Sequence, residues 1–252
     1  MHLDRLIMIL ETLAIAGRPV SAMDVQRATG LPKPTCYRHL QALLKHRLIA
    51  SPGDDGAYVV GERLLGIAML GMSDADVREV ATPLLKTAVV QFNEPVFLAR
   101  LRHQMVEIIH IDTPDDPNRA FIYPGLGERP LHACSCSKAI AAFADPEFRD
   151  NLMRGAHKRY TPFTKTTAPE LRAELDRIRE RGFAECNEEI DMGVASVAAP
   201  IAIGGAGATF SVGAVGPIRR FTSSYRSSVG QALIELARRL GETFQLSRLV
   251  TT

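Results

Sequence analysis

Tryptophan is absent from this chain of 252 residues, and aromatic residues make up only 6% of it. This scarcity argues against a protein that reads carbohydrate or single-stranded nucleic acid with stacked rings. The chain also lacks an uncharged apolar run near the ~20 residues that a membrane span requires. The segment Met1–Ile15 carries charges within its apolar run, as an amphipathic helix does and a signal peptide does not. We therefore expect a cytoplasmic protein with no membrane partner.

Cysteine is also rare, with Cys36, Cys134, Cys136 and Cys186 as the four examples. We expect free thiols in a reducing compartment, either buried or lining a pocket, and no resident metal or cofactor. The C-x-C pair of Cys134 and Cys136 keeps one alternative open, a metal-sensing repressor. A tetrahedral site would need two more ligands, and the near candidates are His132, His110 and Cys186. No third residue is spaced to orient a Cys–His pair, so we do not expect an enzyme.

Positive charge gathers near the start of the chain. The segment Arg18–Arg47 holds six basic residues against one acidic residue, Asp24. Such a cluster is typical of a protein that binds a polyanion, whereas charge without a supporting pattern usually marks only a solvated surface.

The pattern around this charge predicts a helix-turn-helix. Apolar residues three and four apart indicate a first helix over residues 3–14. A second helix opens at Ser21, with Asp24 completing a capping-box-like pair, and ends before Gly30, which supplies a left-handed turn. A third helix runs from Lys33 to about residue 46, with Pro34 in its first turn. Two short strands, 48–51 and 57–60, add a hairpin wing, which favours a winged helix-turn-helix over a structural helical hairpin with accidental charge.

The outer side of the third helix carries the residues expected to contact double-stranded operator DNA. The N-terminal half of such a helix enters the major groove. Arg38 suits a guanine edge or a phosphate, and Lys33 suits a phosphate. The hydroxyl groups of Thr35 and Tyr37 also suit phosphate contacts. The full candidate set is Arg27, Lys33, Pro34, Thr35, Tyr37, Arg38 and Gln41.

The rest of the chain alternates helices and strands in an order typical of an α+β domain with an antiparallel sheet. We expect a DNA-binding domain over residues 1–61, a linker helix within 62–74 and a second domain over 75–252. The helices expected in the second domain cover residues 77–92, 135–143, 146–153, 169–181 and 223–247. The expected strands cover residues 94–102, 105–112, 184–186, 194–203 and 208–215, with a hairpin turn at 204–207.

Several motifs in this order resemble the IclR family of bacterial transcription regulators. In the first domain they are Arg18–Ser21 and Ala28–Arg38. In the second they are Pro130–Ala133 with Lys138–Ala139, Gly182–Ala184 before Glu188–Glu189, Val197–Pro200 and Ser211–Pro217. The resemblance covers nearly the whole chain. It implies a winged helix-turn-helix followed by a GAF-like effector-binding domain, a small-molecule effector, and assembly as a homodimer or a dimer of dimers.

The resemblance also places an effector pocket at Ser135, Cys136, Ser137, Cys186, Asn187, Ser196, Gly213 and Val215. Independently, a helix that starts near Ser135 offers free N–H groups and a positive dipole end to a carboxylate. The alternative is that Ser135 only caps its own helix. Ser137 stands where relatives commonly have glycine, and Gly213 and Val215 make one wall smaller and more apolar. These departures favour a bulky, partly apolar organic or aromatic carboxylate of a catabolic pathway.

Overall fold

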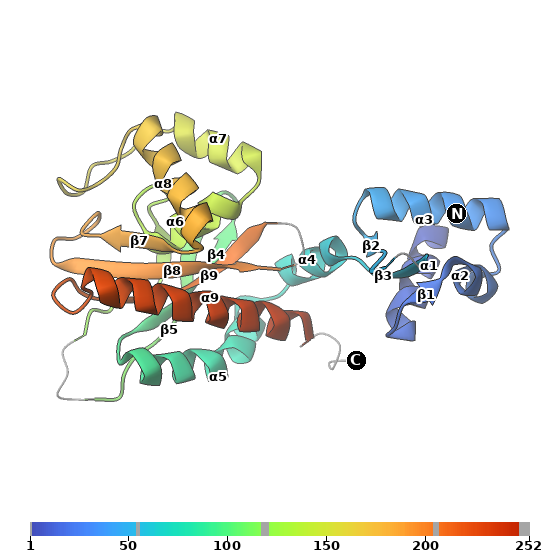
Figure 1. Ribbon diagram of the computed structural model, residues 1–252, viewed down its shortest axis with the longest axis horizontal. Coiled ribbons are helices and arrows are strands. Elements are labelled where there is room, and N and C mark those ends of the chain that lie inside the picture. The colour runs from blue at the N-terminus through green and yellow to red at the C-terminus, as the bar shows by residue number, and fades with distance from the viewer. Residues whose placement is uncertain (1, 54–55, 117–120, 204–206, 247–252) are drawn as a thin grey trace. The chain divides into compact units, whose positions relative to one another are not determined.

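The computed structural model describes residues 2–53, 56–116, 121–203 and 207–246. Two compact units divide the chain, one extending to Gly71 and the other beginning at Met72 (Figure 1). No helix among these residues is long and apolar enough to cross a membrane.

The first unit contains three helices, three short strands and a further helix at its end. In chain order they are α1 (His2–Ala16), β1 (Val20–Ser21), α2 (Ala22–Thr29), α3 (Lys33–Lys45), β2 (Ile49–Ala50), β3 (Ala57–Val60) and α4 (Glu62–Leu70). The strands form an antiparallel sheet in the order β1-β3-β2. The expected winged helix-turn-helix is therefore present, with β1 as a strand that the sequence did not predict. Part of the turn between β2 and β3 lies outside the described residues.

Local signals fix the turn between α2 and α3. The Ser21 hydroxyl accepts a hydrogen bond from the Asp24 N–H at 3.2 Å, so Ser21 caps α2 as expected. Gly30 ends the helix with φ at 65°, in the left-handed region that glycine adopts without strain. Behind this turn, Val25 and Leu40 are fully buried and pack with the α1 residue Ile9 in one core.

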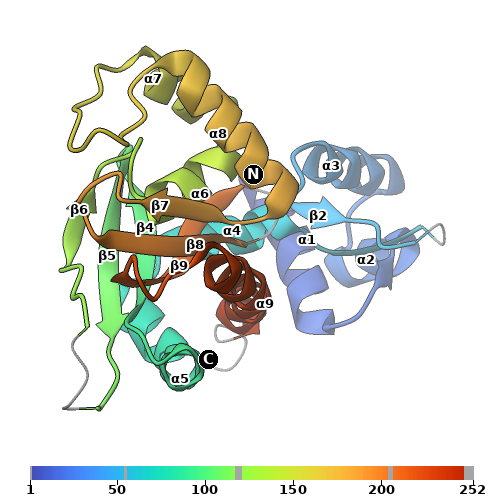
Figure 2. The same cartoon turned by 60° about the vertical axis from the view of Figure 1, so that its left-hand side comes forward.

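The second unit is an α+β domain. Its elements are α5 (Asp74–Phe92), β4 (Val96–Arg102), β5 (Met105–Asp112), β6 (Gly127–Arg129), α6 (Ser135–Phe143), α7 (Pro146–Arg154), α8 (Ala168–Arg181), β7 (Ala184–Asn187), β8 (Val194–Ala202), β9 (Ala208–Pro217) and α9 (Ser223–Leu246). Six strands form an antiparallel sheet in the order β6-β5-β4-β9-β8-β7. Figures 1 and 2 show α6 and α8 on one side of this sheet and α5 and α9 on the other.

The second unit departs from expectation most clearly at the start of α5 and in the segment before α6. Ser73 and Asp76 form a reciprocal capping box, so α5 begins at Asp74 rather than at Val77. The three-residue strand β6 is an element that the sequence did not predict. The expected turn over residues 204–207 and the end of the last helix at residue 247 lie mostly outside the described residues.

The start of the second unit is fastened to the sheet by a buried arginine. Arg100 of β4 donates hydrogen bonds to the Met72 carbonyl oxygen at 2.9 Å and to the Asp74 carboxylate at 2.8 Å. Arg102 reaches the same carboxylate at 2.8 Å. Because Arg100 is only 1% exposed, these contacts satisfy a charge that burial alone would destabilise.

Candidate functional site

Helix α3 separates its residues into an inner and an outer set. Cys36, His39, Leu40 and Leu43 are buried against the core of the first unit. The candidate DNA-contacting residues Lys33, Pro34, Tyr37, Arg38 and Gln41 are exposed, and Thr35 is half-buried. The helix therefore presents one continuous polar and basic side, as an element that enters the major groove must.

The seventh DNA candidate, Arg27, belongs to α2 rather than to α3. Its side chain is 76% exposed and lies 3.4 Å from the Asp24 carboxylate, an exposed pair that water screens strongly. At the start of α3, no side chain caps the helix, because Pro32 occupies the N-cap position. The Lys33 ammonium group lies 6.0 Å from the centre of the Tyr37 ring.

His39 is a titratable residue of α3 that sequence reasoning did not single out. It is buried, and its Nε2 atom has no hydrogen-bond partner among the described residues. Burial lowers the pKa of His39, and the positive charges of His2, Arg38 and Arg5 lower it further. The imidazole is therefore neutral at neutral pH and belongs to the core rather than to the DNA-facing surface.

In the second unit, the candidate effector residues gather where the start of α6 lies on the sheet. Ser135, Cys136, Ser137, Cys186, Ser196, Gly213 and Val215 are all buried there, whereas Asn187 is exposed at the end of β7. The Ser135 and Ser196 hydroxyl oxygens lie 2.7 Å apart. The Ser211 hydroxyl donates a hydrogen bond to the Cys136 carbonyl oxygen at 3.2 Å. Seven of the eight candidates are thus buried where α6 meets β7, β8 and β9.

The alternative role of Ser135 as a helix cap is wrong. The N-cap residue of α6 is Cys134, and it makes no side-chain capping hydrogen bond. Ser135 is the first residue of the helix, and its hydroxyl group forms a hydrogen bond with the Ser196 hydroxyl group of β8 instead. The Ser135 side chain thus links α6 to β8 and does not cap the first-turn N–H groups of the helix.

An aromatic ring covers the wall that Gly213 forms. Phe97 on β4 pairs with Gly213 in the sheet, and a Cβ atom at Gly213 would lie 2.3 Å from the Phe97 ring. The same Cβ atom would lie 2.5 Å from the Val197 carbonyl oxygen. Gly213 is therefore needed for close packing, and the apolar character of this wall comes from Phe97, a residue that the sequence reasoning did not include.

Arg129 is a second residue that sequence reasoning missed. It pairs with Val106 in the sheet, so both side chains stand on the same side, and Val106 packs in the cluster that includes Cys134 and Cys136. One Nη atom of Arg129 bonds the Pro124 carbonyl oxygen at 2.5 Å, while its buried Nε atom has no partner among the described residues. The available signal was its position directly before the Pro130–Ala133 motif.

Two cysteines of this region, Cys134 and Cys186, are held as thiols. Burial raises the pKa of Cys136, but its hydrogen bonds, above all that with Cys134, outweigh burial and lower the pKa overall. The Cys134 and Cys136 sulfur atoms lie 3.3 Å apart. The hydrogen bond with Cys136, together with burial, raises the pKa of Cys134, and burial raises the pKa of Cys186 to about 12. His132 directs its Nε2–H to the Lys158 carbonyl oxygen at 2.9 Å. Within the described residues, no group of three or more His, Cys, Asp or Glu side chains is arranged to hold a metal ion.

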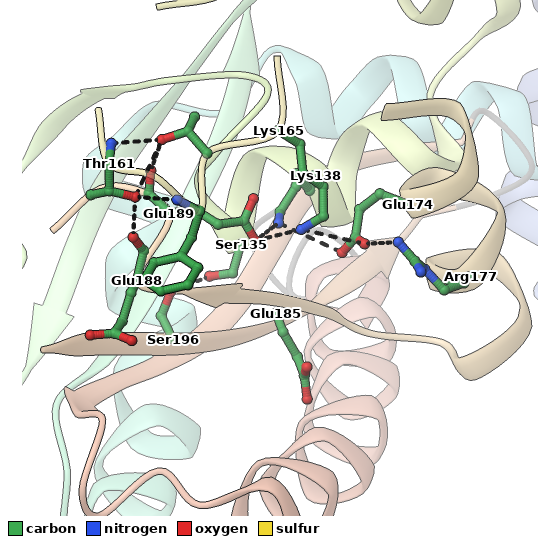
Figure 3. A network of polar contacts seen from close by, with 12 residues as sticks. Ser135, Lys138, Thr161, Lys165, Glu174, Arg177, Glu185, Glu188, Glu189 and Ser196 are labelled. Atoms are coloured by element: carbon green, nitrogen blue, oxygen red, sulfur yellow. Dashed lines mark hydrogen bonds and ion pairs between the residues drawn. The ribbon is translucent and has the colours of Figure 1, made fainter. Parts of the chain in front are cut away.

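A buried ionic network lies beside the Ser135–Ser196 contact (Figure 3). The Lys138 ammonium group is 2.6 Å from Glu189 and 3.6 Å from Glu174. Lys165 lies 3.1 Å from Glu189, and Arg177 lies 2.8 Å from Glu174. Figure 3 shows Lys138 and Lys165 both directed between the two carboxylates. Burial lowers the pKa of Lys138, but the charges of Glu189 and Glu174 outweigh burial and raise it overall.

This network gives the motif residues Lys138 and Glu189 a structural role that their spacing did not reveal. Thr161 donates a hydrogen bond to the Glu188 carbonyl oxygen at 2.6 Å, and Thr164 donates one to the Glu189 carbonyl oxygen at 2.7 Å. The loop after β7 is thereby fixed to the segment that precedes α8. The network holds α6, α8 and this loop together around the candidate effector residues.

Comparisons with known proteins match both units. Residues 2–52 match the IclR helix-turn-helix domain, and residues 69–242 match the bacterial transcriptional regulator IclR C-terminal domain. The glycerol operon regulatory protein of Streptomyces griseus is 32% identical over 222 residues, which cover 86% of this chain and 85% of the relative. The HTH-type transcriptional regulator BhcR of Paracoccus denitrificans (strain Pd 1222) is 30% identical over 239 residues, covering 94% and 85%.

Solved structures show the same fold. The IclR protein of Thermotoga maritima aligns with a TM-score of 0.60 at 22% identity, covering 96% of this chain and 98% of that chain. An IclR homolog from Microbacterium hydrocarbonoxydans, solved in complex with 4-hydroxybenzoate, aligns with a TM-score of 0.61 at 24% identity, covering 98% and 100%. Because family models match both of its units, this chain belongs to the IclR family of bacterial transcription regulators, which are DNA-binding proteins that join a helix-turn-helix domain to an effector-binding domain.

Proposed function

We propose that this protein binds a specific operator in double-stranded DNA through α3 and responds to a small carboxylate that binds at the start of α6. The observation that carries the first part is the exposed basic side of α3, with Lys33 and Arg38 directed away from the core. Arg38 is proposed to contact a guanine or a phosphate, and Lys33 to neutralise a phosphate. Arg27, Pro34, Thr35, Tyr37 and Gln41 complete the proposed contact set.

Three features support a carboxylate as the effector. The first turn of α6 offers backbone N–H groups and the positive end of the helix dipole. Arg129 adds a guanidinium group on the same side of the sheet, and the ring of Phe97 adds an apolar wall. A partly apolar or aromatic carboxylate matches this combination, and a relative of the same fold was solved with 4-hydroxybenzoate.

We propose assembly as a homodimer or a dimer of dimers, with residues 1–61 as the DNA-binding domain, a linker helix within 62–74 and the effector domain over 75–252. A two-fold dimer reads two half-sites separated by one or more helical turns, each of about 34–36 Å. Footprinting on the upstream DNA of its own gene is expected to reveal such a repeated half-site. A single unrepeated half-site would contradict the dimer.

The test of the effector is a thermal-shift screen of aliphatic and aromatic acids, followed by gel retardation with each acid that binds. A ligand that binds only the folded state raises the melting temperature. Among the acids that stabilise the wild type, we expect at least one to change its retardation of DNA, and Arg129→Met to abolish that change while leaving DNA binding without the acid intact. Failure of the purified protein to retard its operator would refute the regulator itself. An effect of the acid on DNA retardation that Arg129→Met leaves unchanged would refute only the proposed site.

A further inference from the structure

A cavity of about 400 Å³ lies in the second unit, apart from the candidate effector residues. Its walls come from α7, from the segment 155–160 and from the turn 130–132, with Gln104 at one end. None of the eight residues proposed to bind the effector lines it. Its volume falls within the range of about 300–1,000 Å³ that small-molecule sites occupy.

The lining combines apolar side chains with basic side chains. Leu131, Phe148 and Leu152 supply apolar surface, and among the described residues no aspartate or glutamate lines the cavity. His157 and Lys158 both contribute to its wall. The Nε2 atom of His157 is buried and has no hydrogen-bond partner among the described residues.

Three rings lie side by side at this wall. The centre of the His132 ring is 4.7 Å from that of His157 and 5.8 Å from that of Tyr160. The Lys158 ammonium group lies 5.1 Å from the centre of the Tyr160 ring. The three rings and the Lys158 ammonium group make this wall both aromatic and cationic.

His132 has a structural role at this wall that its neighbours Lys158 and His157 do not share. His132 is 6% exposed and holds the segment 155–160 in place through its bond to the Lys158 carbonyl oxygen. Burial lowers the pKa of His132, so this ring is neutral at neutral pH and serves as a fixed donor. The Lys158 side chain and the Nε2 atom of His157 are not needed for that contact. The exposed Lys158 ammonium group is therefore available to a ligand, whereas the buried Nε2 atom of His157 needs a small movement of its ring to reach one.

We propose that this cavity is a second ligand site, which binds an aromatic monocarboxylate with its ring against the apolar and aromatic wall and its carboxylate on Lys158 and His157. The charge of the lining favours an anion, because basic groups occur in it without acidic ones. The apolar side chains and the aromatic rings of the lining favour a ligand with an aromatic hydrocarbon body over a fully hydrated ion. The proposal concerns a site distinct from the start of α6 and does not depend on which ligand binds there.

Isothermal titration of the full chain with benzoate tests the proposal, with acetate and benzamide as probes of the ring alone and the charge alone. We expect benzoate to bind and the other two to bind at least about tenfold more weakly, because acetate lacks the ring and benzamide lacks the charge. Lys158→Met and His157→Phe should each weaken benzoate binding by about tenfold or more. The matched variants Arg129→Met and Ser196→Ala, at the start of α6, should leave this binding unchanged.

The position of the ligand can be read directly from crystals soaked with 4-bromobenzoate, in which the bromine atom should give an anomalous peak among Phe148, Leu152 and Tyr160. Unchanged melting temperature and DNA retardation would show that the Lys158 and His157 variants fold. Absence of benzoate binding to the wild type would overturn the proposal. Binding that Lys158→Met and His157→Phe leave intact, or that only the α6 variants remove, would overturn it equally. Neither outcome bears on DNA binding, which the retardation assay measures by itself.

Discussion

The buried ammonium group of Lys138 offers the sharpest test of what holds the second unit together. Replacing Lys138 by methionine keeps most of the side-chain volume and removes the charge that lies 2.6 Å from Glu189. Removing one partner of a buried ion pair costs about 3–5 kcal/mol, because the other charge remains buried without compensation. Lys165 lies 3.1 Å from the same carboxylate and is 26% exposed, so it compensates in part. We therefore expect the lower end, about 3 kcal/mol.

For a domain of this size, each kcal/mol shifts the melting temperature by about 2–4 °C, so Lys138→Met should lower the transition of the second unit by roughly 6–12 °C. Scanning calorimetry measures this shift in melting temperature. The double variant Lys138→Met with Glu189→Gln should recover part of the loss, because it removes the stranded charge as well. Arg154→Met is the control, since its pair with Asp150 is exposed and should contribute less than about 1 kcal/mol. A shift for Lys138→Met no larger than that of the control would refute the reasoning.

Three further predictions address the DNA-binding helix, the sheet and the response to acid. Arg38→Ala should weaken operator binding by about 1–3 kcal/mol, measured by fluorescence anisotropy at fixed salt. The control Lys45→Ala, at the far end of α3, should have a smaller effect. Equal affinities for Arg38→Ala and wild type would remove Arg38 from the contact set. Gly213→Ala should lower the free energy of unfolding in urea by at least about 1–3 kcal/mol, because the added methyl group meets the Phe97 ring; unchanged stability would show that the ring moves freely. Burial raises the pKa of Glu174, but the surrounding ammonium and guanidinium groups outweigh burial and hold this pKa below its ordinary value of 4.5. The stability that ionised Glu174 contributes is therefore complete above pH 4.5 and is lost as the pH falls through the lowered pKa. Glu174→Gln should therefore flatten the acid side of the stability profile, and an unaltered profile would contradict this assignment.

Local signals explain what the sequence predicted well. Ser21, Gly30 and Lys33 lie within a few residues of the turn that they define, so the limits of α2 and α3 could be read from residue type and spacing. The limits of α6, predicted from the pattern along the chain as residues 135–143, agree with those of the structure. The capping box at Ser73 was also readable, and its neglect placed the start of α5 too late.

What could not be predicted depends on contacts between distant segments. Lys138 and Glu189 meet only because α6 and the loop after β7 fold against each other. The pairing of Phe97 with Gly213 requires the register of β4 against β9. Arg129 lies on a strand of only three residues, which carries too little alternation to be recognised from sequence. Lys138 and Phe97 were therefore missed because their partners are far away along the chain, and Arg129 because its strand is too short.

The close approach of Phe97 to Gly213 has an evolutionary consequence. Because the ring fills the space that any side chain at position 213 would need, the two positions share a single volume. A homologue with serine at position 213 must carry a smaller residue at position 97 or place its ring elsewhere. The two positions should therefore change together among relatives, so that the character of this wall is inherited as a pair and not one residue at a time.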